Sequence, residues 1–196
     1  MPVLYLVRHG ETHFNAEQRL GREDTGLNAR GLEQAAHCAR VLRKLFAEDG
    51  RRRADYDYVA SPLRRARETM EVVRATLDLD PKAYAVDPRL MEIFYGNWEG
   101  LTLAEIEAQE PGALERRDRE KWSFRPTGGE CYRDIGNRVA EWYAGVTRDT
   151  IVVAHGGVAR VLLAILNVTS EEEAARTEIR HGVVYVFSEG RLARYD

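Results

Sequence analysis

Apolar residues are distributed along this chain in two alternating patterns. Short apolar runs, continuous at Val3–Val7 and Ile151–Ala154 and interrupted by Asp57 at Tyr56–Ala60, end at polar clusters, and such runs are typical of strands buried in a sheet. A weaker run at 83–86 predicts a further strand. Between the runs, apolar residues recur every three or four positions, which predicts helices with one buried face.

The predicted helices have recognisable ends. Asn28 is the expected N-cap of a long helix, and Ser61-Pro62 predicts a second helix with Ser61 as its N-cap and proline at its first position. The segment Arg89–Gly100 has no apolar period, so it is predicted to be an ordered loop. The apolar stripes of the helices run from Leu32 to Phe46, Leu63 to Leu77, Leu103 to Ala108, Ala113 to Trp122, Tyr132 to Trp142 and Val158 to Leu166.

The order of these elements predicts the fold class. Strands that alternate with helices over short connections favour an open, mostly parallel sheet with helices on both faces. The segments Val183–Phe187 and Leu192–Tyr195, separated by Gly190, predict a hairpin at the edge of that sheet. No linker or internal repeat interrupts the pattern, so residues 1–196 are expected to form a single domain.

Two histidines stand just beyond two of the predicted strands. The first strand leads into Arg8-His9-Gly10, and Ile151–Ala154 leads into His155-Gly156-Gly157. Because the carboxyl ends of parallel strands meet at one edge of a sheet, both histidines are expected in the same crevice. A glycine after each histidine allows the backbone to approach a ligand closely. This matched pair is the strongest signal of an active site in the sequence.

Charge and composition restrict the ligand. The chain has 29 Lys and Arg against 32 Asp and Glu, a net charge of −3, which argues against nucleic acid and anionic membranes as partners. No apolar run has the roughly 20 residues of a membrane helix. The two cysteines, Cys38 and Cys131, are spaced neither as a metal pair nor as a redox motif, so a reducing cytoplasm is the expected location.

Basic residues near the histidines indicate a small anion instead. Arg64 falls in the first turn of the helix that Ser61-Pro62 predicts, where free backbone N–H groups and the helix dipole favour anions. Together with Arg8 it would keep a nearby imidazole neutral and therefore nucleophilic. Two arginines and a second histidine would suffice to hold a phosphoryl group without a metal. Glu92, in the aperiodic loop, is the carboxyl chosen as general acid and later as base.

Several motifs together resemble the histidine phosphatase superfamily, in its phosphoglycerate mutase-like branch. The resemblance runs in order from Leu4 to about Leu166 and is specific, because it combines five separate motifs. They are Leu6-Val7-Arg8-His9-Gly10-Glu11-Thr12 with Asn15, Ser61-Pro62-Leu63-Arg64-Arg65-Ala66, Leu90-Met91-Glu92-Ile93 with Gly96–Gly100, Gly128-Gly129-Glu130, and Ala154-His155-Gly156-Gly157.

The resemblance implies a metal-independent enzyme without a cofactor, in a three-layer α/β/α sandwich. His9 would be the phosphorylated nucleophile and Glu92 the proton donor. The residues implied to hold the phosphate are Arg8, Asn15, Arg64, His155 and the backbone N–H of Gly156. The loop Arg19–Asp24, with Gly21 and Arg22 as expected substrate contacts, lacks the glutamine that usually precedes the glycine and is one residue short. This loop usually helps to choose the substrate.

The predicted function is a histidine acid-type phosphatase, a phosphoric monoester hydrolase acting on a small phosphorylated metabolite. Only 155 − 92 = 63 positions separate Glu92 from His155. This is short for a mutase of the family, whose insertions protect the phosphohistidine from water. Two alternatives stay open: a phosphoglycerate mutase-type phosphoryl transferase, and a non-catalytic phosphate-binding module. The oligomeric state is also open, with a homodimer as one option.

Overall fold

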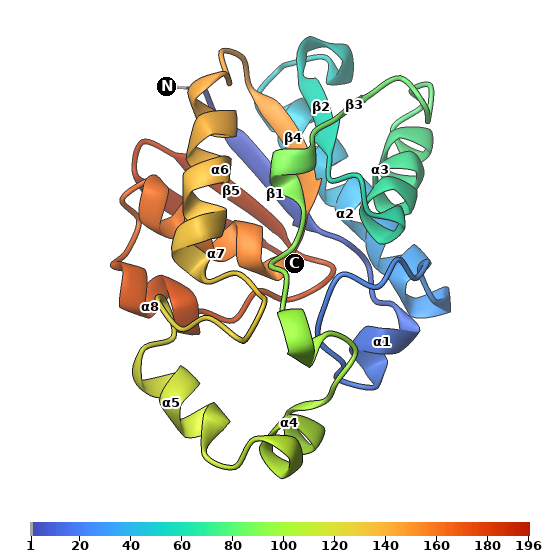
Figure 1. The fold of residues 1–196 in the computed structure, drawn as a ribbon. Coiled ribbons are helices and arrows are strands. Elements are labelled where there is room, and N and C mark those ends of the chain that lie inside the picture. The colour runs from blue at the N-terminus through green and yellow to red at the C-terminus, as the bar shows by residue number, and fades with distance from the viewer. Residues whose placement is uncertain (1) are drawn as a thin grey trace.

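A six-stranded sheet forms the centre of the molecule (Figure 1). The computed structural model describes residues 2–196. The strands lie in the order β3-β2-β4-β1-β5-β6, and β3, β2, β4 and β1 are mutually parallel, whereas β5 and β6 run antiparallel to their neighbours. The strands are β1 (Leu4–Arg8), β2 (Asp57–Ala60), β3 (Ala85–Val86), β4 (Thr150–Ala154), β5 (Val184–Ser188) and β6 (Arg191–Tyr195).

Helices cover both faces of the sheet, which confirms the three-layer α/β/α sandwich. Alternate residues of β1 point to opposite faces. Leu4 and Leu6 pack in the cluster that contains α6 (Tyr132–Ala144), α7 (Gly156–Ile165) and α8 (Glu171–Arg176). Tyr5 and Val7 pack in the cluster that contains α2 (Ala29–Glu48) and α3 (Arg64–Thr76). The sheet is therefore apolar on both sides, as the continuous apolar runs predicted.

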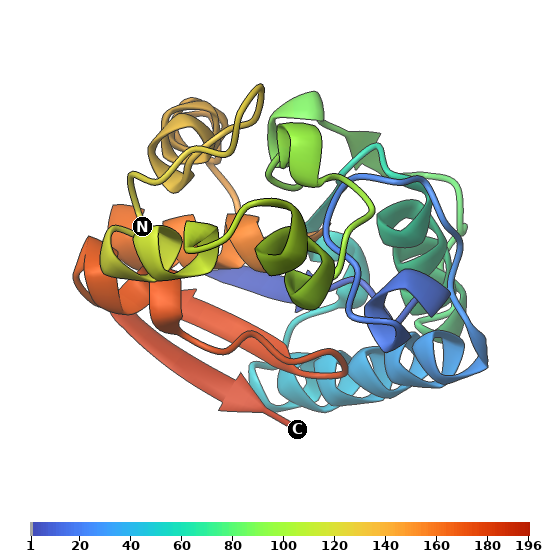
Figure 2. The same ribbon diagram turned by 60° about the horizontal axis from the view of Figure 1, so that its bottom comes forward.

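A separate excursion lies beyond the carboxyl ends of the parallel strands. It contains α4 (Leu103–Gln109) and α5 (Ala113–Arg119) and has a small core of its own, formed by Trp98, Ile106 and Ala113. Figures 1 and 2 show both helices on the side where β1 ends, together with α1 (His13–Ala16). This excursion covers the edge of the sheet at which the two histidines stand. Short 3-10 helices occupy Arg53–Asp55, Pro88–Leu90 and Gly96–Trp98.

The ends of the elements show where the sequence patterns were sufficient. Asn28 caps α2 as predicted, because its side chain accepts a hydrogen bond from the Gly31 N–H at 2.8 Å. The prediction for Ser61 was wrong: α3 begins at Arg64 with Leu63 at the N-cap. The Ser61 N–H instead bonds to the Val153 carbonyl at 3.0 Å. The chain therefore stays beside β4 for one more residue before it turns into the helix.

Helix α8 was not predicted. The run Glu171–Glu173 is exposed and forms the first turn of α8, where Ser170 and Glu173 make a capping box. The hairpin of β5 and β6 at the sheet edge is confirmed. Among residues 2–196, every helix is too short or too polar to cross a bilayer.

Candidate active site

A cleft of about 210 Å³ opens at the carboxyl edge of the sheet. Residues from β1, α3, α7 and the loops between them line it, including His9, Glu92 and Gly156. Six of the lining side chains are cationic, and Glu92 is the one carboxylate among them. The cationic residues are Arg8, Arg19, Arg65, Arg117, Lys121 and Arg160. The cleft is therefore strongly positive although the chain as a whole is slightly acidic.

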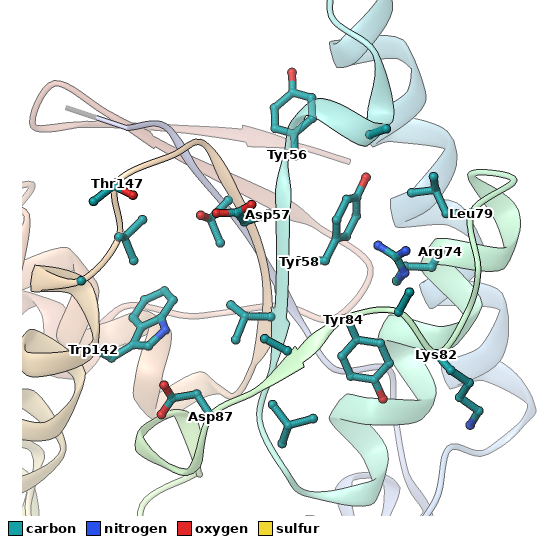
Figure 3. Close-up of a pocket in the computed structure, with 18 of the residues that line it drawn as sticks. Tyr56, Asp57, Tyr58, Arg74, Leu79, Lys82, Tyr84, Asp87, Trp142 and Thr147 are labelled. Carbon is teal, nitrogen blue, oxygen red and sulfur yellow. The ribbon is translucent and has the colours of Figure 1, made fainter.

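A larger groove of about 760 Å³ lies elsewhere, at the β2–β3 edge of the sheet (Figure 3). Tyr58, Arg74 and Tyr84 stand on one side of β2 and Trp142 on the other. The Arg74 guanidinium lies over the Tyr58 ring, 4.5 Å from its centre. This groove is lined by no histidine and shares no lining residue with the cleft. The candidate chemistry therefore belongs to the smaller hollow.

His9 is held as a neutral imidazole with one nitrogen available. Its Nδ1 lies 2.8 Å from the Gly10 carbonyl oxygen. Because a carbonyl only accepts, Nδ1 carries the proton and Nε2 keeps its lone pair. Burial lowers the pKa of His9 well below its usual range, and His155, Arg65 and Arg8 lower it further. The ring is thus unprotonated at neutral pH, the state that a nucleophile requires.

His155 lies beside His9, with the ring centres 5.1 Å apart. It is fully buried, and its Nε2 lies 2.7 Å from the Ser61 hydroxyl oxygen. Its Nδ1 is buried and has no hydrogen-bond partner in residues 2–196. Burial, then Arg65 and Arg8, lowers the pKa of His155 well below its usual range. Ser61 therefore orients this histidine, a role that the sequence pattern of a helix cap did not suggest.

Arg64 does not lie in the cleft, which corrects the prediction. It is the first residue of α3, its side chain is 62 % exposed, and its Nε pairs with Glu68 at 2.7 Å. The neighbouring Arg65 points inward instead and donates from Nε to His9 Nε2 at 3.2 Å. Successive helical residues differ by about a quarter of a turn or more, so only one of the two arginines can face the histidines.

Arg65 is fixed in place by loop carbonyls. It donates from Nη1 to Glu23 O at 2.8 Å and from Nη2 to Gly21 O at 3.1 Å. The loop that the resemblance associates with substrate choice therefore also holds the arginine closest to His9. Burial lowers the pKa of Arg65 from its ordinary value, and Glu92 opposes this shift.

Arg8 presents an unsatisfied donor. Its Nη1 donates to the Ile179 carbonyl at 2.6 Å, whereas its Nε is buried without a partner in the described part of the chain. Burial lowers the pKa of Arg8 to about 10, so the guanidinium stays charged at neutral pH. A buried, charged donor without an acceptor is costly unless an anion binds it.

Glu92 lines the cleft together with His9, from the loop that follows the 3-10 helix Pro88–Leu90. Its Oε1 accepts from the Gly157 N–H at 3.0 Å and from the Ile93 N–H at 2.9 Å. Its Oε2 makes one longer contact, 3.3 Å, with the same Gly157 N–H. A methyl group at Gly157 would lie 2.2 Å from Oε1, so glycine is required there for the carboxylate to reach the start of α7.

The other predicted substrate contacts divide into two groups. Asn15, Gly21 and Gly156 line the cleft. Arg22 does not: it donates to the Glu92 carbonyl and pairs with Glu130, both at 2.6 Å. The structure therefore corrects the expectation for Arg22, whose Nε and Nη2 are engaged by protein groups and brace the Glu92 loop.

A third histidine, His181, stands beside the pair, although no sequence motif includes it. The structure places its ring 5.4 Å from that of His9, in the loop between α8 and β5. Burial, then Arg8 and Arg30, lowers the pKa of His181 to about 3, so it adds no positive charge beside His9. No pattern in the sequence connected this loop with β1.

Residues 2–196 contain no group of three or more His, Cys, Asp or Glu side chains placed to hold a metal ion. The candidate chemistry described above uses the histidines, arginines and Glu92 of the cleft.

The sequence is similar to known proteins over nearly its whole length. The family model described as histidine phosphatase superfamily (branch 1) matches residues 4–191. A Mycolicibacterium vanbaalenii protein named glucosyl-3-phosphoglycerate phosphatase is 36 % identical over 177 residues, which cover 83 % of this chain and 73 % of the relative. A Gloeobacter violaceus protein named 2,3-bisphosphoglycerate-dependent phosphoglycerate mutase 2 is 30 % identical over 198 residues, which cover 95 % and 85 %.

The fold is similar to that of a solved relative. The structure of a mycobacterial glucosyl-3-phosphoglycerate phosphatase, described in complex with VO3, superposes with a TM-score of 0.79 at 31 % identity. The superposition covers 99 % of this chain and 97 % of the relative. Both similarities therefore include the two histidines and the cleft between them.

Proposed function

The chain belongs to the histidine phosphatase superfamily (branch 1), and we propose that it is a phosphomonoesterase that hydrolyses a small phosphorylated metabolite through a phosphohistidine on His9. One observation carries the proposal: the unprotonated His9 Nε2 lies 3.2 Å from the Arg65 guanidinium. This pair stands in a cleft that also presents the unpartnered Arg8 Nε and lies against the unpartnered His155 Nδ1. A nucleophile surrounded by unused donors for an anion is the arrangement that phosphoryl transfer requires.

The proposed reaction has two steps. Arg8, Arg65, His155 Nδ1 and the Gly156 N–H bind the phosphoryl oxygens, and His9 Nε2 attacks phosphorus while the ester P–O bond breaks. Glu92 gives its proton to the leaving alkoxide. Glu92 then takes a proton from water, the resulting hydroxide attacks phosphorus, and the P–N bond breaks to release phosphate and free His9. Arg65 must leave the His9 lone pair for this attack and turn its Nε–H to a phosphoryl oxygen.

The relatives guide the choice of substrate. The two relatives described above are named glucosyl-3-phosphoglycerate phosphatase and phosphoglycerate mutase, and a further relative from Saccharomyces cerevisiae is named fructose-2,6-bisphosphatase. The higher identity to the phosphatase and the short covering excursion with α4 and α5 favour hydrolysis over mutase action. Glucosyl-3-phosphoglycerate is accordingly the first metabolite to assay.

The test of the proposal is phosphate release together with trapping of the intermediate. The protein is expected to release phosphate from p-nitrophenyl phosphate, and rapid quenching in base is expected to trap a phosphoryl label that acid removes. A non-catalytic phosphate-binding module would release no phosphate and trap no label. With 3-phosphoglycerate, a mutase would accumulate the 2-phospho isomer, whereas the proposed enzyme yields inorganic phosphate.

The role of Glu92 predicts a dependence on the leaving group. Glu92→Gln keeps the shape of the side chain but cannot exchange a proton. Phosphate release from an alkyl phosphate such as glycerol 3-phosphate should fall by about 10²-fold. The rate of the first step, the phosphorylation of His9, should fall much less with p-nitrophenyl phosphate, because p-nitrophenolate leaves without protonation. Single-turnover measurements of the two substrates check this, and an equal loss in the first step for both would remove Glu92 from the role of acid.

A further inference from the structure

Two arginines outside the cleft donate hydrogen bonds to the backbone carbonyl of Glu92. Arg22 Nε lies 2.6 Å from this oxygen, and Arg138 Nη2 lies 3.2 Å from it. Arg22 belongs to the loop between α1 and α2, whereas Arg138 lies on α6. Two segments that are distant in the sequence thus converge on the peptide group that joins Glu92 to Ile93.

The other end of this peptide group holds the Glu92 carboxyl. The Ile93 N–H donates to Glu92 Oε1 at 2.9 Å, and the Gly157 N–H donates to the same oxygen at 3.0 Å. Because a peptide group is planar, its C=O and its N–H turn together. A rotation that freed the carbonyl from the arginines would therefore also carry the Ile93 N–H away from Oε1. The arginines thus fix one of the two donors that orient the carboxyl.

Glu130 brings the two arginines together. Its Oε2 pairs with Arg22 Nη2 at 2.6 Å and with Arg138 Nη2 at 3.4 Å. Within residues 2–196, neither arginine forms a salt bridge with another carboxylate. The Arg22, Glu130 and Arg138 side chains are only 23 %, 25 % and 19 % exposed, so water screens these ion pairs less than it would at the surface. The Glu130 charge is therefore what allows two cations to share one carbonyl.

Glu130 also binds the Glu92 segment directly. Its N–H donates to the Phe94 carbonyl at 2.7 Å, and its Oε2 accepts from the Phe94 N–H at 2.9 Å. A methyl group at Gly129 would lie 2.7 Å from the same Phe94 oxygen, so glycine is required there for the two segments to approach. The Gly128-Gly129-Glu130 motif thus places a carboxylate against the segment that carries Glu92.

The loop that contains Arg22 reaches the nucleophile at its other end. The Gly21 carbonyl accepts from Arg65 Nη2 at 3.1 Å, and Arg65 donates from Nε to His9 Nε2 at 3.2 Å. The ion pair between Arg22 and Glu130 therefore completes a continuous series of contacts between His9 and the Glu92 segment. Glu130 itself does not line the cleft.

We propose that Glu130 is a positioning residue for general acid catalysis: its carboxylate holds the two arginines on the Glu92 carbonyl and so keeps the Glu92 carboxyl directed at the leaving oxygen. The proposal rests on the role of Glu92 in the function proposed above. Without the Glu130 charge, two guanidinium groups would repel each other beside one carbonyl. The nucleophile and the phosphate ligands would stay, so only proton transfer to the leaving group should suffer.

Glu130→Gln tests this role, because it keeps the shape of the side chain and removes its charge. In single-turnover measurements, the rate at which glycerol 3-phosphate phosphorylates His9 should fall by about tenfold, since a misplaced acid protonates the alkoxide less often. With p-nitrophenyl phosphate the same rate should change by less than about twofold, because p-nitrophenolate leaves without protonation.

Glu71→Gln is the matched control. Glu71 lies on α3, is 22 % exposed and pairs with Lys82 at 2.6 Å, so its burial and its ion pair resemble those of Glu130. It does not line the cleft. The rates with both esters should stay within about twofold of those of the unaltered protein, and the melting temperatures of the two variants show whether each folds.

A double variant separates positioning from a general structural role. In protein that already contains Glu92→Gln, adding Glu130→Gln should lower the rate with glycerol 3-phosphate by less than about twofold further. A residue that acts through Glu92 has no carboxylic acid left to position, so the two losses should not multiply. Losses that do multiply would overturn the proposal.

Other outcomes would also overturn it. Equal losses with the two esters in folded Glu130→Gln would exclude a selective effect on the acid, and an unchanged rate with glycerol 3-phosphate would exclude any effect. If Glu130→Gln does not fold, Arg22→Met removes the shorter hydrogen bond to the Glu92 carbonyl and must show the same selective loss. Failure of the unaltered protein to release phosphate or to trap a label from any ester would instead refute the proposed function.

Discussion

His9→Ala is expected to abolish phosphate release from p-nitrophenyl phosphate, with a loss of at least about 10⁴-fold in kcat. Covalent catalysis through this residue accounts for the size of the effect, because the arginines and Glu92 would remain without an atom to receive the phosphoryl group. The buried ring is neutral and its Nε2 faces Arg65, so its removal leaves the cationic pocket in place. Phosphate binding should therefore survive while turnover is lost.

The control for this variant is His37→Ala. His37 lies on α2 and does not line the cleft, so its removal should change kcat by less than about threefold. Circular dichroism and the melting temperature check that both variants fold. Substantial turnover by folded His9→Ala, or an acid-labile phosphoryl label in it, would exclude His9 as the nucleophile.

The fold could be predicted from the sequence because its central strands are buried on both faces and are therefore apolar throughout. Val3–Val7 and Ile151–Ala154 are apolar at every position, so they predict central strands of a parallel sheet. The observed β1 and β4 are neighbours in that sheet. Once they are neighbours and parallel, His9 and His155 must emerge at the same edge, and their ring centres lie 5.1 Å apart. The pairing of the histidines was thus predictable from strand pattern alone.

The groups that complete the cleft come from segments without such a pattern. His181 stands in a loop, Lys121 follows a short helix, and Ser61 holds His155 from a bend before α3. Loop conformations depend on long-range contacts, such as the hydrogen bonds from Arg65 to Gly21 and Glu23. Neither residue spacing nor composition determines those contacts, which is why the sequence indicated the two histidines and Arg8 but not these flanking groups.

The confusion between Arg64 and Arg65 has a simple physical origin. The motif Leu63-Arg64-Arg65-Ala66 offers two adjacent arginines, and a helix assumed to start at Ser61 gave no basis for choosing between them. The buried stripe of α3 contains Ala66, Thr69, Met70 and Val73. Arg65 is one turn before Thr69 and shares that side of the helix, whereas Arg64 is one turn before Glu68 on the opposite side. Helical phase therefore identifies Arg65.

Arg65→Met is expected to lower kcat/KM by about 10²- to 10³-fold, the usual effect of removing one donor from a developing anion. Arg64→Met removes the same charge one position away and should lower kcat/KM by less than about threefold, because Arg64 pairs with Glu68 outside the cleft.

The pH profile of the Arg65→Met variant adds a signature that mere misfolding would not produce. Arg65 is one of the cations that lower the pKa of His9, so in Arg65→Met this pKa rises and more of the histidine is protonated in acid. The loss should consequently be larger at pH 5 than at pH 8. Equal losses in the two arginine variants, in proteins with unchanged melting temperatures, would contradict the assignment of Arg65 to the phosphate pocket.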